Sequence, residues 1–121
     1  MASLRAAVSA LEIYDQLGFP AENIKLTLNH NTYATGIKQV QLEKVLGRTF
    51  DFTFAYEPKE VFRAINFGEP FILKEPELPL SFTMEDVAYS LSDDIRKNLP
   101  PAAPTPAWKR VTARTAEKKT S

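Results

Sequence analysis

Apolar and polar residues alternate with two different periods in the N-terminal half of the chain. Between residues 3 and 17 the apolar positions recur at intervals of three and four, which predicts a helix. Between residues 24 and 28 they alternate with polar positions, which predicts a strand. The same periods return, predicting a helix over residues 37–46 and a strand over residues 50–54. A further helix is expected from Pro58 to Gly68, because proline suits the first turn of a helix.

Prolines divide the C-terminal half into segments. Three of them predict irregular structure across residues 68–80, since proline lacks the backbone N–H that helices and strands use. The longest helical stripe of apolar residues follows over residues 84–99, with Thr83 and Asp86 spaced as a capping box at its start. A pair of prolines then ends this predicted helix.

These elements divide the chain into residues 1–99, which we expect to fold, and residues 100–121, which we expect to form a disordered Pro/Ala-rich basic tail. The order helix, strand, helix, strand, helix, helix is typical of an α/β unit, because parallel strands need a helical crossover between them. Two strands leave both outer edges of a sheet unpaired. The predicted fold class is therefore α/β, with a partial parallel sheet of two visible strands and flanking helices. We expect these two strands to be part of a larger sheet.

Composition excludes several classes of protein. With 121 residues, 44% of them hydrophobic and 25% charged, the chain has the size and balance of one modest globular domain. The absence of cysteine excludes thiol catalysis, iron–sulfur clusters and cysteine-based zinc sites. The sequence holds no hydrophobic run long enough to span a bilayer, and we expect the protein to be cytoplasmic.

The formal net charge of zero conceals an uneven distribution. Residues before Pro100 carry a net charge of −4 and the remainder carries +4. An acidic domain predicts no specific nucleic-acid binding, because phosphate contacts need clustered basic residues. In the tail, Trp108 and Val111 are too few apolar residues for a stable interfacial helix, so we predict no stable membrane association.

Motifs of phosphate chemistry are missing. The four glycines stand far apart, at positions 18, 36, 47 and 68, so no phosphate-binding loop is present. His30 is the single histidine, which excludes a histidine-rich metal site. We therefore predict no catalytic residue and no metal ligand in this chain.

Asn29 is the most informative polar residue. It stands where the first predicted strand ends, and the carboxyl ends of parallel strands are where such sheets bind ligands. Its amide offers the donor and the acceptor that are needed to read a purine edge. The alternative is a turn residue that hydrogen-bonds its own backbone. His30 follows at the same strand end, with an exposed loop histidine as its alternative.

Several short segments stand in a recognisable order. They are LGFP before the first strand, Asn29 and His30 after it, a helix with Ile37, Glu43, Leu46 and Gly47, and a last helix with Ala64, Asn66, Gly68 and Pro70. By these segments, residues 4–73 resemble the C-terminal half of the MinD/ParA superfamily of deviant Walker ATPases. The branch most similar to them holds the CpaE/TadZ-like pilus-assembly proteins. The resemblance implies the C-terminal part of a SIMIBI-type P-loop NTPase fold.

The same resemblance implies roles for four residues. Asn29 contacts the nucleotide base, while Tyr56 and Pro58 flank the pocket, and His30 stands where the family commonly has arginine. The complete family protein binds ATP with Mg²⁺. Its phosphate- and magnesium-binding motifs belong to the half that we expect this chain to lack. We therefore expect the isolated chain to be inactive and to bind no cofactor tightly.

Three functions stay open at this point. The first is the distal half of an ATPase switch in spatial positioning or pilus assembly, whose partner is the missing N-terminal half or a partner ATPase subunit. The second is a non-catalytic adaptor derived from such an ATPase, which binds protein partners of a pilus or positioning system. The third is an unrelated small α/β binding module.

Overall fold

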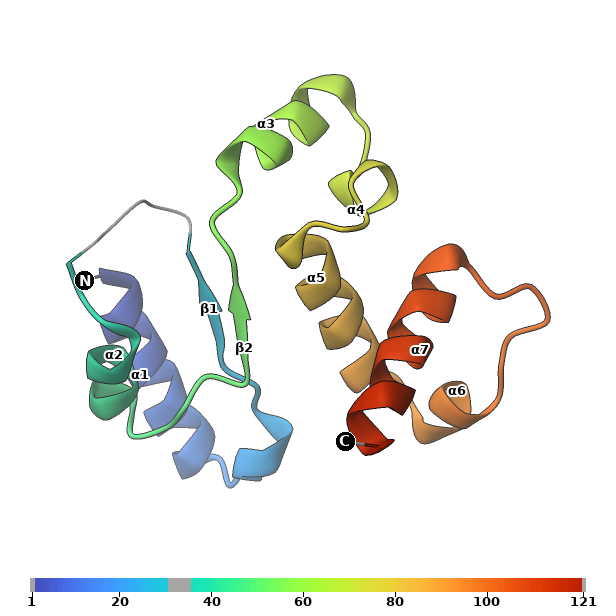
Figure 1. Ribbon diagram of the computed structural model, residues 1–121. Coiled ribbons are helices and arrows are strands. Elements are labelled where there is room, and N and C mark those ends of the chain that lie inside the picture. Colours follow the sequence, from blue (N-terminus) through green and yellow to red (C-terminus); the bar gives the residue numbers. More distant parts are fainter. Residues whose placement is uncertain (1, 31–35, 121) are drawn as a thin grey trace. The chain divides into compact units, whose positions relative to one another are not determined.

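A computed structural model of the chain describes residues 2–30 and 36–120 and divides into two compact units (Figure 1). The first unit is Met1–Thr53 and the second unit is Phe54–Ser121. Helices make up most of the fold, and two strands form a small parallel sheet. This confirms the predicted mixed α/β class with two parallel strands.

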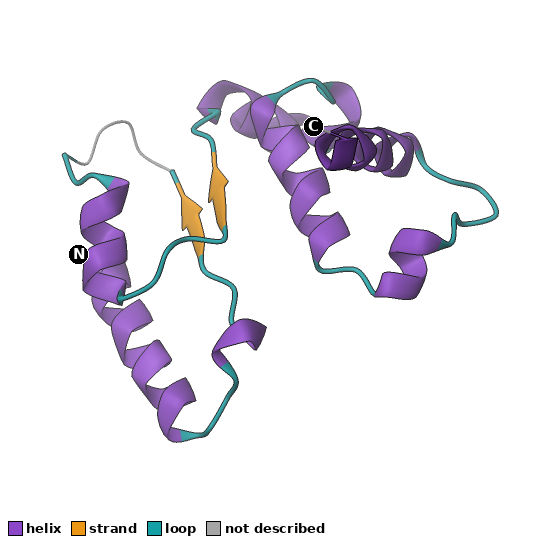
Figure 2. Ribbon diagram, turned by 60° about the horizontal axis from the view of Figure 1, so that its bottom comes forward, coloured by secondary structure: helices purple, strands orange, loops and turns teal. Residues whose placement is uncertain are grey.

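The first unit follows the predicted order of helix, strand, helix and strand. Its elements are α1 (Ala2–Gln16), the 3₁₀ helix η1 (Ala21–Asn23), β1 (Thr27–Asn29), α2 (Gln39–Leu46) and β2 (Phe52–Phe54), whose last residue is the first of the second unit. Helices α1 and α2 pack against each other, and β1 lies beside β2 (Figures 1 and 2). Gly47 ends α2 with a φ of 66°, a left-handed conformation that glycine adopts without strain.

Both strands are shorter than predicted, because extended backbone forms a strand only where a neighbouring strand offers partners. Ile24 is extended, with φ −102° and ψ 116°, but its carbonyl accepts a hydrogen bond of 2.9 Å from Nη2 of Arg48. The ladder begins at Leu26, whose carbonyl accepts hydrogen bonds from the backbone N–H groups of Asp51 and Phe52. A side chain therefore occupies the acceptor that the predicted strand start would have offered to a neighbouring strand.

The second unit is a series of helices. They are α3 (Pro58–Phe67), α4 (Phe71–Lys74), α5 (Pro79–Ser90), α6 (Asp94–Asn98) and α7 (Pro106–Thr120). Pro58 opens α3, as predicted. The prediction of irregular structure over residues 68–80 was wrong, because two of its prolines stand where helices begin. Pro70 is the N-cap of α4 and Pro79 is at the first turn of α5, positions where a missing N–H costs nothing.

The long helix predicted for residues 84–99 is two helices in the structure. Helix α5 already includes Thr83, whose hydroxyl donates 3.0 Å to the carbonyl of Pro79, so Thr83 and Asp86 do not form the expected capping box. The hydroxyl groups of Ser90 and Ser92 donate to the carbonyls of Val87 and Ala88. Such local bonds compete with the next turn of the helix, and α5 ends at Ser90.

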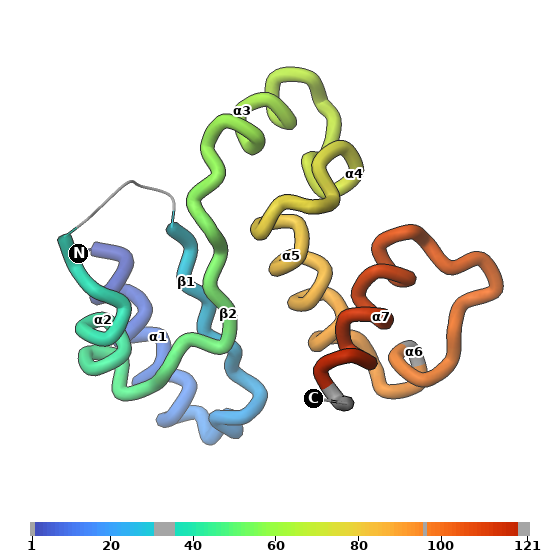
Figure 3. Tube along the Cα trace, viewed as in Figure 1, coloured from blue at the N-terminus to red at the C-terminus, as the bar shows by residue number. Residues whose placement is uncertain are grey.

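The structure also differs from the predicted disordered tail. Residues 106–120 form α7, which packs along α5 in the second unit (Figure 3). Val111 of α7 is 4% exposed and Leu80 of α5 is 5% exposed, and in the described part of the chain no other apolar side chain is buried to this degree. The composition of this segment is that of a disordered chain, but its contacts with α5 give it a partner surface.

Many large apolar side chains are exposed in both units. Examples from the first unit are Leu17, Val40 and Val45, and α3 of the second unit adds Phe62, Ile65 and Phe67 at 64%, 69% and 74% exposure. Within residues 2–30 and 36–120, no helix has the length and apolar character needed to cross a membrane.

Candidate functional site

Asn29 and His30 lie at the carboxyl end of β1, as the sequence predicted for Asn29. Asn29 is the last residue of the strand, His30 follows directly, and both side chains are exposed. An exposed amide has a donor and an acceptor available for a ligand. The residues after His30, from 31 to 35, lie outside the described part of the chain.

Tyr56 and Pro58 follow the second strand. Tyr56 is half-buried between β2 and α3, and Pro58 is the first residue of α3. These two residues belong to the second unit, whereas Asn29 and His30 belong to the first. Each of the four predicted residues therefore lies at the end of a strand or near the start of a helix. The nucleotide pocket that they are expected to form stays a prediction.

The position of β1 depends on polar contacts from the loop that precedes β2. A carboxylate oxygen of Asp51 accepts 2.8 Å from the backbone N–H of Leu26, and Nζ of Lys25 lies 3.7 Å from the other. Nη2 of Arg48 donates to the carbonyls of Ala21 and Ile24 at 3.0 and 2.9 Å. Together these side chains hold the approach to β1, and with it the strand that ends at Asn29.

Glu43 performs a similar task within the first unit. Its Oε1 accepts hydrogen bonds from Nε2 of Gln39 at 2.9 Å and from the backbone N–H of Phe50 at 3.1 Å. The bond from Gln39, then the bond from Phe50, lower the pKa of Glu43 below its ordinary value, because both favour the carboxylate. Glu43 thereby fixes the turn between α2 and β2.

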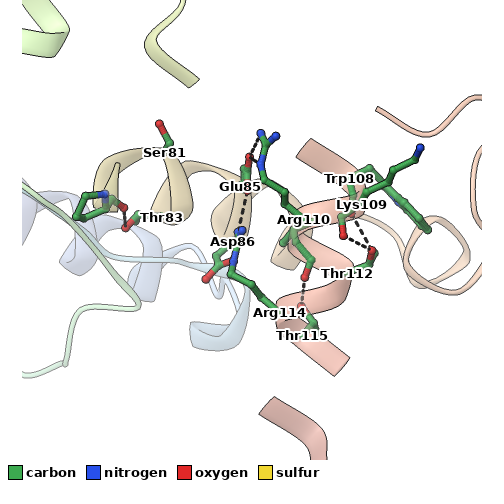
Figure 4. A network of polar contacts seen from close by, with 12 residues as sticks. Ser81, Thr83, Glu85, Asp86, Trp108, Lys109, Arg110, Thr112, Arg114 and Thr115 are labelled. Atoms are coloured by element: carbon green, nitrogen blue, oxygen red, sulfur yellow. Dashed lines mark hydrogen bonds and ion pairs between the residues drawn. The ribbon is translucent and has the colours of Figure 1, made fainter. Parts of the chain in front are cut away.

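The largest polar cluster lies between α5 and α7 in the second unit (Figure 4). Glu85 of α5 is 4% exposed, and its Oε1 accepts hydrogen bonds from Nε and Nη2 of Arg110. Its Oε2 lies 2.9 Å from Nη2 of Arg114, an ion-pair distance without hydrogen-bond geometry. Two guanidinium groups thus neutralise one buried carboxylate.

Arg114 connects this cluster to further residues of α5. Its Nη2 donates 2.9 Å to Asp86, and its guanidinium lies 4.8 Å from the centre of the Phe82 ring, a cation–π distance. Burial of the guanidinium lowers the pKa of Arg114, but Asp86 and Glu85 outweigh this effect and raise the pKa above its ordinary value. Arg114 therefore stays charged at any physiological pH within this α5–α7 ion network.

The sequence analysis missed this network because its basic half fell in the predicted tail. One signal was present: Arg110, Arg114 and Lys118 recur every four residues, the spacing of one face of a helix. Its acidic partner Asp86 was interpreted as part of a capping box with Thr83. Ion pairs between the charged faces of two helices can be predicted from a sequence only when both segments are recognised as helices.

Across the described residues, no three His, Asp or Glu side chains gather closely enough to hold a metal ion. Comparisons with known proteins add no relatives: no family model matches the chain, and neither a curated protein nor a solved structure matches it.

Proposed function

We propose that the chain is the distal part of a nucleotide-binding ATPase switch of the MinD/ParA type, similar to the CpaE/TadZ branch and working in pilus assembly or spatial positioning. The observation that carries the proposal is the exposed amide of Asn29 at the carboxyl end of β1 in a parallel sheet. In open parallel sheets this is the position where ligands bind. The fold is then the C-terminal part of a SIMIBI-type domain.

In this proposal Asn29 contacts the nucleotide base, and His30, Tyr56 and Pro58 flank the base. The phosphates and the Mg²⁺ ion are held by a separate phosphate-binding half, because a triphosphate needs a glycine-rich loop of clustered backbone N–H donors with its lysine, and this sequence has no such loop. The chain alone is accordingly not an ATPase.

The exposed apolar side chains support the need for such a second half. A folded chain rarely leaves so many large side chains in water unless another surface covers them. Two apolar side chains, Leu80 and Val111, are buried in the described residues, whereas Leu17, Val40 and Phe62 are more than half exposed. A sheet of two short strands also has edges that further strands can extend.

Nucleotide titration of the ¹⁵N-labelled full chain tests the proposal. Adenosine and Mg-ATP should both shift the side-chain amide of Asn29 and the backbone amides of β1, with similar and weak affinity because the phosphates have no binding loop. The Asn29→Ala variant should lose the shifts at β1. The matched control is Asn23→Ala, which changes another exposed asparagine of the first unit.

Shifts that are absent at millimolar adenosine, or that persist in Asn29→Ala, would rule out the base contact. Micromolar affinity for Mg-ATP with weak adenosine binding would contradict the missing phosphate site.

A second candidate function is the non-catalytic adaptor. The exposed pair Phe62 and Ile65 on α3 favours it, because residues three apart lie on one face of a helix and an exposed apolar face is a common protein-binding surface. An adaptor binds its protein partner without nucleotide. The titration therefore separates the two functions, since an adaptor gives no response at Asn29.

A further inference from the structure

The second unit contains an open-sided cavity of about 350 Å³ between α5 and α7, and part of its lining is exposed to solvent. Met84 and Tyr89 line it from α5, and Trp108 and Val111 line it from α7. Leu99 and Pro101, from the segment that joins the two helices, close a further side. Its lining residues do not include Asn29, His30, Tyr56 or Pro58, so the cavity shares no residue with the proposed nucleotide site.

Small residues leave this space open. Ala88 of α5 and Ala107 of α7 both line the cavity, and larger side chains at these positions would fill it. Its volume lies at the small end of the range of ligand pockets, roughly 300 to 1,000 Å³.

The chemistry of the walls indicates the kind of occupant. Trp108 and Tyr89 offer aromatic surface, and the thioether of Met84 contacts aromatic rings favourably. Ser92 and Thr105 also line the cavity. The Ser92 hydroxyl donates to the carbonyl of Ala88 and keeps its acceptor capacity, whereas the Thr105 hydroxyl accepts from the backbone N–H of Trp108 and keeps its O–H to donate to a polar substituent. This combination of mostly apolar walls with a few polar groups is typical of sites for small organic molecules.

The electrostatics favour a neutral molecule. Glu85 is the charged side chain in the wall, and its carboxylate is already paired with Arg110 and Arg114 of the α5–α7 ion network. A charged ligand would enter an apolar space without an available counter-ion, at a high desolvation cost. An uncharged ligand avoids this cost.

We propose that this cavity binds a small uncharged aromatic molecule. The ligand lies between Trp108 on one wall and Met84 and Tyr89 on the other, and Glu85 keeps the two helices at the spacing that leaves room for it.

Fluorescence titration with N-phenyl-1-naphthylamine, an uncharged aromatic dye, tests this site in the full chain. Trp108 is the single tryptophan of the sequence, so all tryptophan emission reports on the cavity wall. The dye should quench this emission by energy transfer and saturate at one molecule per chain. Its sulfonated analogue, 8-anilino-1-naphthalenesulfonate, should bind at least about tenfold more weakly, because its charge has no partner in the cavity.

Cavity-filling variants provide the specific control. Ala107→Phe should weaken binding of the uncharged dye by at least about tenfold, whereas Ala113→Phe, at an exposed position of α7 outside the cavity, should leave it unchanged. Ala88→Phe fills the cavity from the opposite helix and serves if Ala107→Phe loses its helical circular dichroism.

Several results would overturn the proposal. Dye binding that does not saturate, or that is equal in the filled and control variants, assigns the dye to the exposed apolar surfaces. Equal or tighter binding of the sulfonate overturns the neutral ligand class. A dimer that light scattering detects in the wild-type chain and not in Ala107→Phe, without dye binding, assigns the cavity to a side chain of a second copy.

Discussion

At the scale of single residues, Glu43 shows how one partly exposed carboxylate organises a turn. The same oxygen accepts a hydrogen bond from Gln39 one helical turn earlier and from the backbone N–H of Phe50 beyond the end of α2. Both donors favour the ionised form, which is why the pKa of Glu43 is lowered. The stabilisation that Glu43 provides therefore depends on pH.

We expect the effect of Glu43→Gln to shrink as the pH falls. Because the folded state lowers the pKa, Glu43 stabilises the fold above the ordinary pKa of glutamate, and this contribution is lost as the pH falls through the folded-state pKa. Protection of the Phe50 amide against hydrogen exchange should thus be greater in the wild type than in Glu43→Gln at about pH 7, and the difference should disappear as the pH is lowered through the folded-state pKa.

The control for this prediction is Glu12→Gln, at an exposed glutamate of α1. It should leave Phe50 protection unchanged from the wild type at every pH. A difference between wild type and Glu43→Gln that is constant over the whole pH range would show that packing, and not the charge, stabilises the turn.

At the scale of elements, the packing of α7 on α5 depends on the buried carboxylate of Glu85. We expect Glu85→Ala to destabilise the second unit by about 2–3 kcal/mol, because two neighbouring guanidinium groups lose their shared partner. This is less than for a fully buried pair, since the side chains of Arg110 and Arg114 are 26% and 23% exposed and water replaces part of the lost interaction.

Asp86→Ala is the matched control, at the adjacent acidic residue of the same helix. Asp86 pairs with Arg114 and Lys118, but its side chain is 37% exposed, so its loss should cost less than about 1 kcal/mol. Urea unfolding followed by the emission of Trp108 measures both variants. Equal midpoints for the two variants would show that the burial of Glu85 adds nothing to the pairing.

The same elements show how far the sequence predicts this structure. Local patterns were sufficient for α1, α2 and α3, because their apolar spacing and terminal residues, such as Gly47 and Pro58, lie within the segment itself. Helix α7 was missed because its stability comes from a partner that is more than twenty residues away, through contacts such as that of Arg110 with Glu85. The strand end at Asn29 was predicted, whereas the cavity beside Trp108 needed both helices to be known.

At the scale of the whole molecule, each unit has its own set of polar contacts. In the first unit Arg48 bonds the carbonyls of Ala21 and Ile24, and in the second the hydroxyl of Ser81, which is fully buried, donates 2.7 Å to the carbonyl of Glu75. Because each of these hydrogen bonds joins two residues of the same unit, removing one of them should destabilise that unit alone.

We therefore expect Arg48→Met to increase hydrogen exchange in residues 20–26 and not in α5 or α7. Removing the guanidinium takes its donor from the carbonyl of Ile24 and one of two donors from the carbonyl of Ala21, at a cost of about 1 kcal/mol, which corresponds to a factor of about five in exchange. Ser81→Ala should likewise raise exchange, but in the other unit. Exchange should rise in α5 and stay unchanged in β1, because the lost hydrogen bond joins two residues of the second unit. Mass spectrometry of peptides from both units measures the two effects in one experiment, with Arg5→Met at an exposed arginine of α1 as the control for a lost surface charge. Exchange that rises in α7 when Arg48 is replaced, or in β1 when Ser81 is replaced, would show that the two units unfold as one cooperative body.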